Sequence, residues 1–180
     1  MRTDGSGLTP VPVPADFEVD DPTLSPSGEE VAYTAGPPTG AEGGSLYVTR
    51  LTDGTVRRLT TPPGATDDGD PAWSPDGSTI AFRRRIANGT AEGNLDLWTV
   101  PADGSGAPTS LTAGSKAVEQ DPSWAPSGRE LAFRSSASTP SYPGDRQLRV
   151  WLMDADGGNR HLLWTSKGAG EQTVPSWTRH

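Results

Sequence analysis

The sequence contains no cysteine, which excludes disulfides, thiolate nucleophiles and cysteine-ligated metals. It has no run of the ~20 apolar residues that a transmembrane helix needs. The first residues, MRTDGSGLTPVPVPADFEVDD, lack the apolar core of a signal peptide. As written, the chain is therefore expected in the cytoplasm; as a fragment or a mature form it would suit the periplasm or secretion.

Catalytic motifs are lacking as well. There are only two histidines, His161 in a predicted strand and His180 at the last position. No Gly-x-Ser-x-Gly elbow, His-Glu-x-x-His pair or Gly-x-x-x-x-Gly-Lys-Ser/Thr loop occurs. The sequence therefore predicts a protein that is not an enzyme and that has no cofactor.

Basic charge is scarce too. The 23 acidic and 15 basic residues give a net charge of −8, and no block of Lys and Arg occurs. Nucleic acids and anionic membrane surfaces attract proteins through clustered positive charge. The composition therefore argues against both as partners, and no window suggests membrane insertion.

Glycine and proline, in contrast, are abundant, with 22 and 18 residues. They belong to a repeat, which distinguishes them from a low-complexity sequence. The copies read DPTLSPSGEEVAY (Asp21–Tyr33), DPAWSPDGSTIAF (Asp70–Phe82) and DPSWAPSGRELAF (Asp121–Phe133), with a partial copy VPSWTRH (Val174–His180). The prolines of these copies, Pro22, Pro71, Pro122 and Pro175, are 49, 51 and 53 residues apart. A period near 50 residues indicates blades or stacked arrays.

Each copy predicts a β-hairpin, because Pro, Asp or Ser, and Gly occupy consecutive turn positions between two β-like runs. In the second copy, four strands are expected at residues 72–74, 79–84, 96–101 and 109–112. The third strand has alternating equivalents at Ser45–Leu51 and Leu148–Asp154. No helix is expected.

Four antiparallel strands repeated at near-constant spacing describe a β-propeller blade. The predicted fold is all-β, a partial ring of about three and a half blades. We divide it into a terminal strand of an incomplete blade plus linker (1–20), three blades (21–69, 70–120 and 121–172) and the first strand of a further, incomplete blade (173–180).

The strings WSPDGSTIAF, LWTVPADGSG and SLT, in this order, resemble the WD-like, PD40-type repeat of TolB-type β-propellers. The repeats depart from that pattern at Leu24, Ser27, Ala125 and Ser127. The resemblance implies a propeller, usually six-bladed, that acts in protein–protein interaction, in that family with an envelope lipoprotein and other Tol components. Similar propellers also precede the hydrolase domain of prolyl-oligopeptidase-type peptidases.

Two functions follow from these observations. The first is a non-catalytic scaffold or binding module with a protein or peptide partner, since the loops vary and carry no catalytic residues. The alternative is the gating propeller of a peptidase, inactive alone. A carbohydrate- or ligand-binding propeller is a third option. A partial ring also leaves blade faces exposed, so we expect either missing blades from a longer chain or self-association to complete it.

Acidic residues supply most of the candidate sites. Asp21, Asp70 and Asp121 recur at one repeat position, where they either cap backbone N–H groups or line a channel mouth that binds a cation or a basic peptide. Asp154, Asp156 and Asn159 alternate in a predicted turn. Asx-turn hydrogen bonding explains them, and a calcium ion is the second interpretation.

Five of the six tryptophans also hold repeat positions. Trp73, Trp124 and Trp177 share one, and Trp98 and Trp151 share another with Tyr47. Such positions predict packing between adjacent blades. Trp164 has no repeat counterpart and is a candidate partner contact. The short runs Arg57–Arg58 and Arg83–Arg85 are interpreted as solvated strand faces or protected edges.

Overall fold

The computed structural model describes residues 9–38, 43–64, 66–86, 94–138, 147–163 and 175–177. These residues form three four-stranded antiparallel sheets with the strands in chain order. The first sheet comprises β1 (Glu18–Leu24), β2 (Glu30–Gly36), β3 (Ser45–Arg50) and β4 (Val56–Arg58). The second comprises β5 (Asp68–Trp73), β6 (Thr79–Ile86), β7 (Asn94–Pro101) and β8 (Thr109–Ser110). The third comprises β9 (Glu119–Trp124), β10 (Glu130–Ser135), β11 (Arg149–Asp154) and β12 (His161–Leu162).

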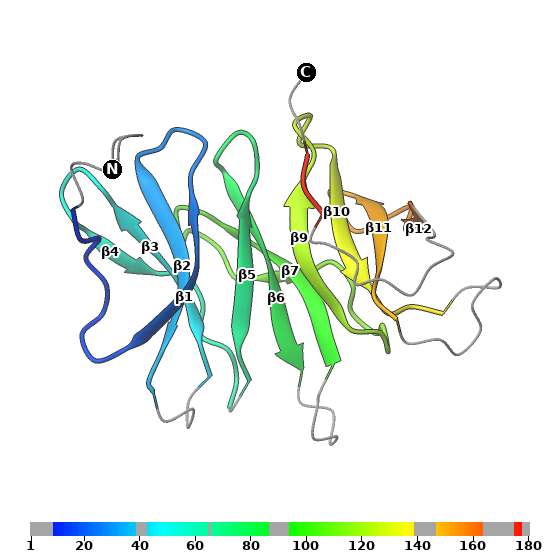
Figure 1. Cartoon of the computed structure of the whole chain (residues 1–180), viewed down its shortest axis with the longest axis horizontal. Coiled ribbons are helices and arrows are strands. Elements are labelled where there is room, and N and C mark those ends of the chain that lie inside the picture. Colours follow the sequence, from blue (N-terminus) through cyan, green and yellow to red (C-terminus); the bar gives the residue numbers. More distant parts are fainter. Residues whose placement is uncertain are drawn as a thin grey trace.

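The three sheets stand side by side, each as one blade (Figure 1). Strand β5 contacts both β1 and β9, so the first strands of consecutive blades lie next to one another. In a propeller this innermost position lines the central channel, and we call the surface formed by β1, β5 and β9 the channel wall. The described parts of the chain contain no helix, and hence none that is long and apolar enough to cross a bilayer.

The first strand of each blade begins before the Asp-Pro pair, whereas the sequence predicted that in the second blade it would begin after it. A β-bulge accommodates the pair: the register shifts between Gly69 and Ala72 in β5 and at the corresponding places in β1 and β9. The aspartates Asp21, Asp70 and Asp121 adopt the left-handed conformation, with φ of 53°, 52° and 53°. Proline has no N–H to donate to the neighbouring strand. Because the bulge leaves one residue out of the hydrogen-bonded ladder, the strand can continue through the Asp-Pro pair.

The predicted hairpin between the first two strands is confirmed in all three blades. In the second blade the N–H of Ser74 donates to the carbonyl of Thr79 and that of Gly77 donates to Ser74, at 2.8 and 2.9 Å. Gly77 has a φ of 74°, a conformation that favours glycine. The Ser-Pro-Asp-Gly sequence is therefore the turn chemistry that the hairpin needs.

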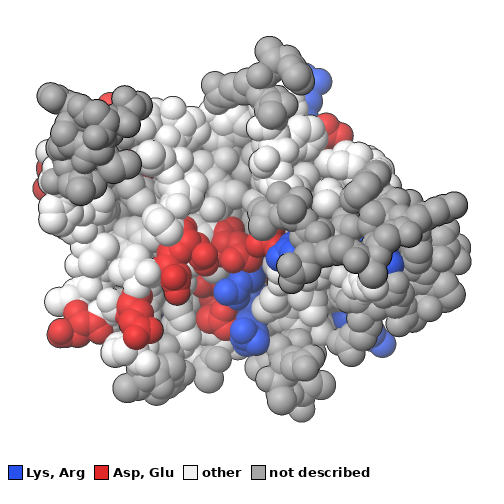
Figure 2. Space-filling view, viewed as in Figure 1, with Lys and Arg blue, Asp and Glu red and all other residues white. Residues whose placement is uncertain are grey.

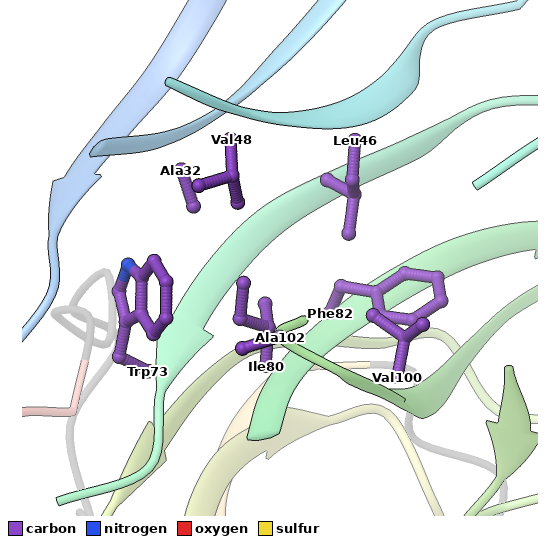
Figure 3. Packing of buried hydrophobic residues seen from close by; sticks show 8 residues of the cluster. All are labelled: Ala32, Leu46, Val48, Trp73, Ile80, Phe82, Val100 and Ala102. Carbon is purple, nitrogen blue, oxygen red and sulfur yellow. The ribbon is translucent and has the colours of Figure 1, made fainter. Parts of the chain in front are cut away.

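The core consists of layers between blades. The first layer joins Ala32, Leu46 and Val48 of the first blade to five residues of the second, Trp73, Ile80, Phe82, Val100 and Ala102 (Figure 3). The second layer joins the second blade to the third and includes Leu97, Leu131 and Phe133. Burying each such side chain contributes about 1.5–3 kcal/mol, so each blade is stabilised mainly by its neighbour.

Part of the face of the first blade that points away from the second is covered by the segment before β1. Phe17 packs edge-on against Tyr47, with ring centroids 6.3 Å apart, and Tyr47 stacks on Tyr33. The hydroxyl of Thr49 donates to the carbonyl of Pro12 at 2.8 Å. The segment before β1 therefore occupies part of the surface on which a preceding blade would pack.

Candidate binding face along the channel wall

The three repeat aspartates are linked across blades. The backbone N–H of Asp70 donates to Oδ2 of Asp21 at 3.2 Å, and that of Asp121 donates to Oδ2 of Asp70 at 3.3 Å. We call this series the aspartate ladder. Asp21 and Asp70 each accept a backbone N–H, and in both cases the donor belongs to the next blade. Their carboxylates therefore lie in a row on the channel wall.

In the second blade, arginines of β6 form ion pairs with the carboxylates of the channel wall and of the residue before β5. Arg83 contacts Asp67 at 2.6 Å and Asp70 at 3.2 Å, and Arg85 contacts Asp67 at 2.5 Å. Burial pushes the pKa of Asp67 upward, but the hydrogen bonds from Arg85 and Arg83 outweigh burial and leave it below its usual value. In Asp70 burial prevails over Arg83, and the neighbouring aspartates add to it, so its pKa is raised.

Arg84 forms the deepest ion pair of this set. Its Nε and Nη2 donate to the two carboxylate oxygens of Asp68 at 2.6 and 2.8 Å. Asp68 is 0% exposed and Arg84 is 7% exposed, and the guanidinium lies 4.8 Å from the ring centroid of Trp98. The interpretation of Arg83–Arg85 as a solvated face is therefore wrong for Arg84, which is buried, whereas Arg85 is 41% exposed and all three side chains pair with carboxylates of β5 or the residue before it.

The third blade repeats the arrangement with one arginine. Arg134 donates through Nε to Oδ2 of Asp121 at 2.5 Å, and Gln120 adds a bond of 3.2 Å to the same oxygen. Arg83 and Arg134 each lie 13 residues after their aspartate. This constant offset within the repeat was the sequence signal that could have identified the pairing.

The first blade lacks the arginine. Thr34 lies opposite Asp20 in the register, where Arg83 lies opposite Gly69 and Arg134 opposite Gln120. The acidic side chains Glu18, Asp20 and Asp21 are exposed on β1 and form no ion pair with any described residue. Figure 2 shows the acidic side chains gathered at the centre of this face, with basic ones beside only part of them. We call Glu18, Asp20 and Asp21 the acidic strand.

The opposite end of the channel wall is apolar and aromatic. Trp73, Trp124 and Trp177 hold one level of the wall, and each indole N–H donates to a carbonyl of the preceding first strand, at 3.1 to 3.2 Å. This confirms the predicted packing between blades for these three tryptophans. Together with repeat prolines they line a groove of about 450 Å³. Leu24 takes the tryptophan position in the first blade and is 60% exposed.

The calcium candidates lie in the turn between β11 and β12. Asn159 donates through its amide to Oδ2 of Asp154, and Oδ1 of Asp156 accepts from the N–H of Gly158 at 2.9 Å. Among the described residues no group of three or more His, Asp or Glu side chains is arranged to hold a metal ion. His161 bonds to the carbonyl of Asn159 in the same turn. Trp164 and His180 lie outside the described residues.

The fold defines a β-propeller, and solved structures place it among TolB-type propellers. A TolB-like protein from Agrobacterium tumefaciens is 30% identical, with a TM-score of 0.62 over 85% of this chain and 50% of that chain. TolB from Acinetobacter baumannii is 20% identical, with a TM-score of 0.69 over 93% of this chain and 37% of that chain. The predicted TolB-type β-propeller fold, present here as a partial ring, is confirmed.

Other comparisons are less specific. An uncharacterized protein of Agrobacterium fabrum is 33% identical over 135 residues, 74% of this chain and 43% of that protein. A prolyl endopeptidase shares the fold at 14% identity, with a TM-score of 0.57 over 85% of this chain and 23% of that chain. No protein-family model matches the chain. The chain thus spans half or less of the length of these relatives.

Proposed function

We propose that this propeller segment is a non-catalytic binding module whose protein or peptide partner lies on the channel wall. The observation that carries the proposal is the acidic strand. In the second and third blades an arginine at the Thr34 position contacts the repeat aspartate, and in the first blade the cation is absent from the described residues. A partner that brings its own cation would complete the pattern.

The partner is expected to carry basic residues beside apolar ones. Glu18, Asp20 and Asp21 place three negative charges on exposed positions of a single strand. The groove lined by Trp73, Trp124 and Trp177 lies along the same first strands. Attraction between charges steers the encounter, whereas burial in an aromatic groove supplies most of the affinity. An extended segment with arginine or lysine followed by leucine or proline has this chemistry.

The test is titration of the chain with a synthetic peptide that has two arginines followed by leucine and proline, read out by tryptophan fluorescence. The variant Asp20→Asn/Asp21→Asn should bind at least ~10-fold more weakly, and salt should weaken binding to the wild type. Thr34→Arg, which supplies the cation within the chain, should weaken binding in the same way. Glu29→Gln, at an exposed site outside the channel wall, is the control. Equal binding by all four proteins would refute the proposal.

The second candidate function is the gating propeller of a peptidase, supported by the prolyl endopeptidase that shares this fold. It requires a hydrolase domain with a Gly-x-Ser-x-Gly elbow in the same polypeptide. A complete gene that encodes further repeats and no such domain would rule it out.

A further inference from the structure

The boundary between the second and third blades buries two carboxyl groups that come from different blades. Asp96, in β7, is 6% exposed, and Glu119, the first residue of β9, is 2% exposed. Neither Oδ1 of Asp96 nor Oε2 of Glu119 has a hydrogen-bond partner or contact with solvent. A buried carboxylate oxygen without a donor is unfavourable, and protonation of the group relieves the cost.

At this boundary one oxygen of Glu119 accepts a hydrogen bond and the other does not. Oε1 of Glu119 accepts from the hydroxyl of Ser115 at 3.1 Å, and the hydroxyl of Thr112 also stabilises the Glu119 carboxylate. Burial nevertheless raises the pKa of Glu119, and the charge of Asp96 raises it further. The charge of Asp96 therefore acts on Glu119 across the boundary.

The cations around the pair do not neutralise it. Arg160, from the turn before β12, lowers the pKa of both carboxyl groups, but burial outweighs it. Arg84 lies opposite Asp96 in the register, and its Nε and Nη2 donate to Asp68.

Two further cations belong to the third blade and to the loop that leads into it. Arg149 lies two strands from Glu119, opposite Ser135, and donates to the carbonyl of Gln147. Lys116 is exposed in the loop before β9.

The first blade boundary has a different arrangement. At the positions 51 residues earlier, Asp68 corresponds to Glu119 and Ser45 to Asp96. Only one carboxyl group is therefore present, and Arg84 binds both of its oxygens. Of the two blade boundaries that the structure describes, the one between the second and third blades is the one that buries two carboxyl groups without a bound arginine.

We propose that Asp96 and Glu119 form a pH-responsive lock, which retains a proton while the second and third blades are packed and loosens the boundary when that proton is lost. Burial raises the pKa of Asp96 to about 6. Because the folded state then binds protons more tightly than the unfolded state, stability is greatest below the unfolded pKa and falls as pH rises through the folded pKa. The boundary should therefore be more stable at pH 5 than at pH 8.

Asp96→Asn and Glu119→Gln test the lock, with Glu29→Gln as the control for loss of an exposed carboxylate. Asp96→Asn should raise the melting temperature by roughly 5 °C at pH 8 and by clearly less at pH 5, because pH 5 lies between the unfolded and folded pKa values of Asp96. Hydrogen exchange of the amides of β9, corrected for intrinsic rates, should slow in the same variant, and more at pH 8 than at pH 5.

Two results would overturn the proposal. One is the same difference between wild type and Asp96→Asn at pH 5 and at pH 8. The other is a rise in melting temperature with 1 mM Ca²⁺ at pH 8 in the wild type but not in either variant, which would mean that a cation and not a proton occupies the pair. If Glu119→Gln does not fold, Asp96→Asn alone decides the question.

Discussion

The indole N–H of Trp124 donates a 3.1 Å hydrogen bond to the carbonyl oxygen of Ala72 in the preceding blade. Trp73 makes the equivalent bond to Thr23. The tryptophan that packs in each blade boundary thus also fixes the position of its strand along the first strand of the preceding blade. Tryptophan is the residue for this position because it combines a large apolar surface with a single donor.

Trp124→Phe should lower the free energy of unfolding by about 1–2 kcal/mol, because it removes the hydrogen bond between the indole and the Ala72 carbonyl of the preceding blade. Trp98→Phe is the matched control. The indole nitrogen of Trp98 is buried and has no partner, so its removal costs no hydrogen bond. Urea unfolding of both variants measures the difference, and an equal loss in the two would contradict the assignment.

The ion pair of Arg84 and Asp68 should behave as a buried pair. Arg84→Met leaves the fully buried Asp68 without its cation, and we expect a loss of about 3–5 kcal/mol in unfolding free energy. The double variant Arg84→Met/Asp68→Leu should recover most of that loss. Thermal unfolding of the two proteins at pH 7 checks this, and a double variant as unstable as the single one would argue against it.

Thr112 closes the second blade through its side chain. The hydroxyl oxygen of Thr112 accepts the N–H of Leu97 at 2.9 Å, and Thr60 accepts that of Leu46 in the first blade. Thr112→Val keeps the shape but leaves a buried N–H unpaired, which should cost about 1–3 kcal/mol. Thr112→Ser retains the acceptor and is the control. In denaturant unfolding, the free energy of unfolding of Thr112→Ser should be higher than that of Thr112→Val.

Gly157 is predicted to be sensitive to substitution. Its φ is 87°, and a Cβ there would lie 2.4 Å from the carbonyl oxygen of Leu111. Gly114 has a similar φ of 82° but open space around it. Gly114→Ala should therefore cost only the backbone strain, about 1 kcal/mol, and Gly157→Ala clearly more. Comparable melting temperatures would show that the turn can move away from Leu111.

The architecture could be predicted because it is repeated. A hairpin turn with Pro and Gly at fixed places, copied three times, identifies strands and blades without knowledge of their contacts. The contacts of Asp70 with the next blade, the partners of Arg84 and Arg85, and the buried pair of Asp96 and Glu119 could not be assigned in this way. Whether Asp70 binds a neighbour or a ligand depends on which backbone N–H the next blade presents, and that distance is set by packing.

The arginines illustrate the same limit. Arg83, Arg84 and Arg85 read as a charged strand face, since alternation along a strand says nothing about what the neighbouring strand carries. The structure places carboxylates opposite them. Asp96 and Glu119 are 23 residues apart in the sequence, and only the stacking of blades brings their charges together.

The aspartate ladder has one more consequence. Each rung uses the carboxylate of one blade and the backbone of the next, so the contact has a donor side and an acceptor side, as in a heterologous interface between subunits. A gene segment duplicated in frame would therefore supply a new blade with a compatible surface on both flanks. Blade number in such a protein can change by copying a unit, without redesign of the contacts between units.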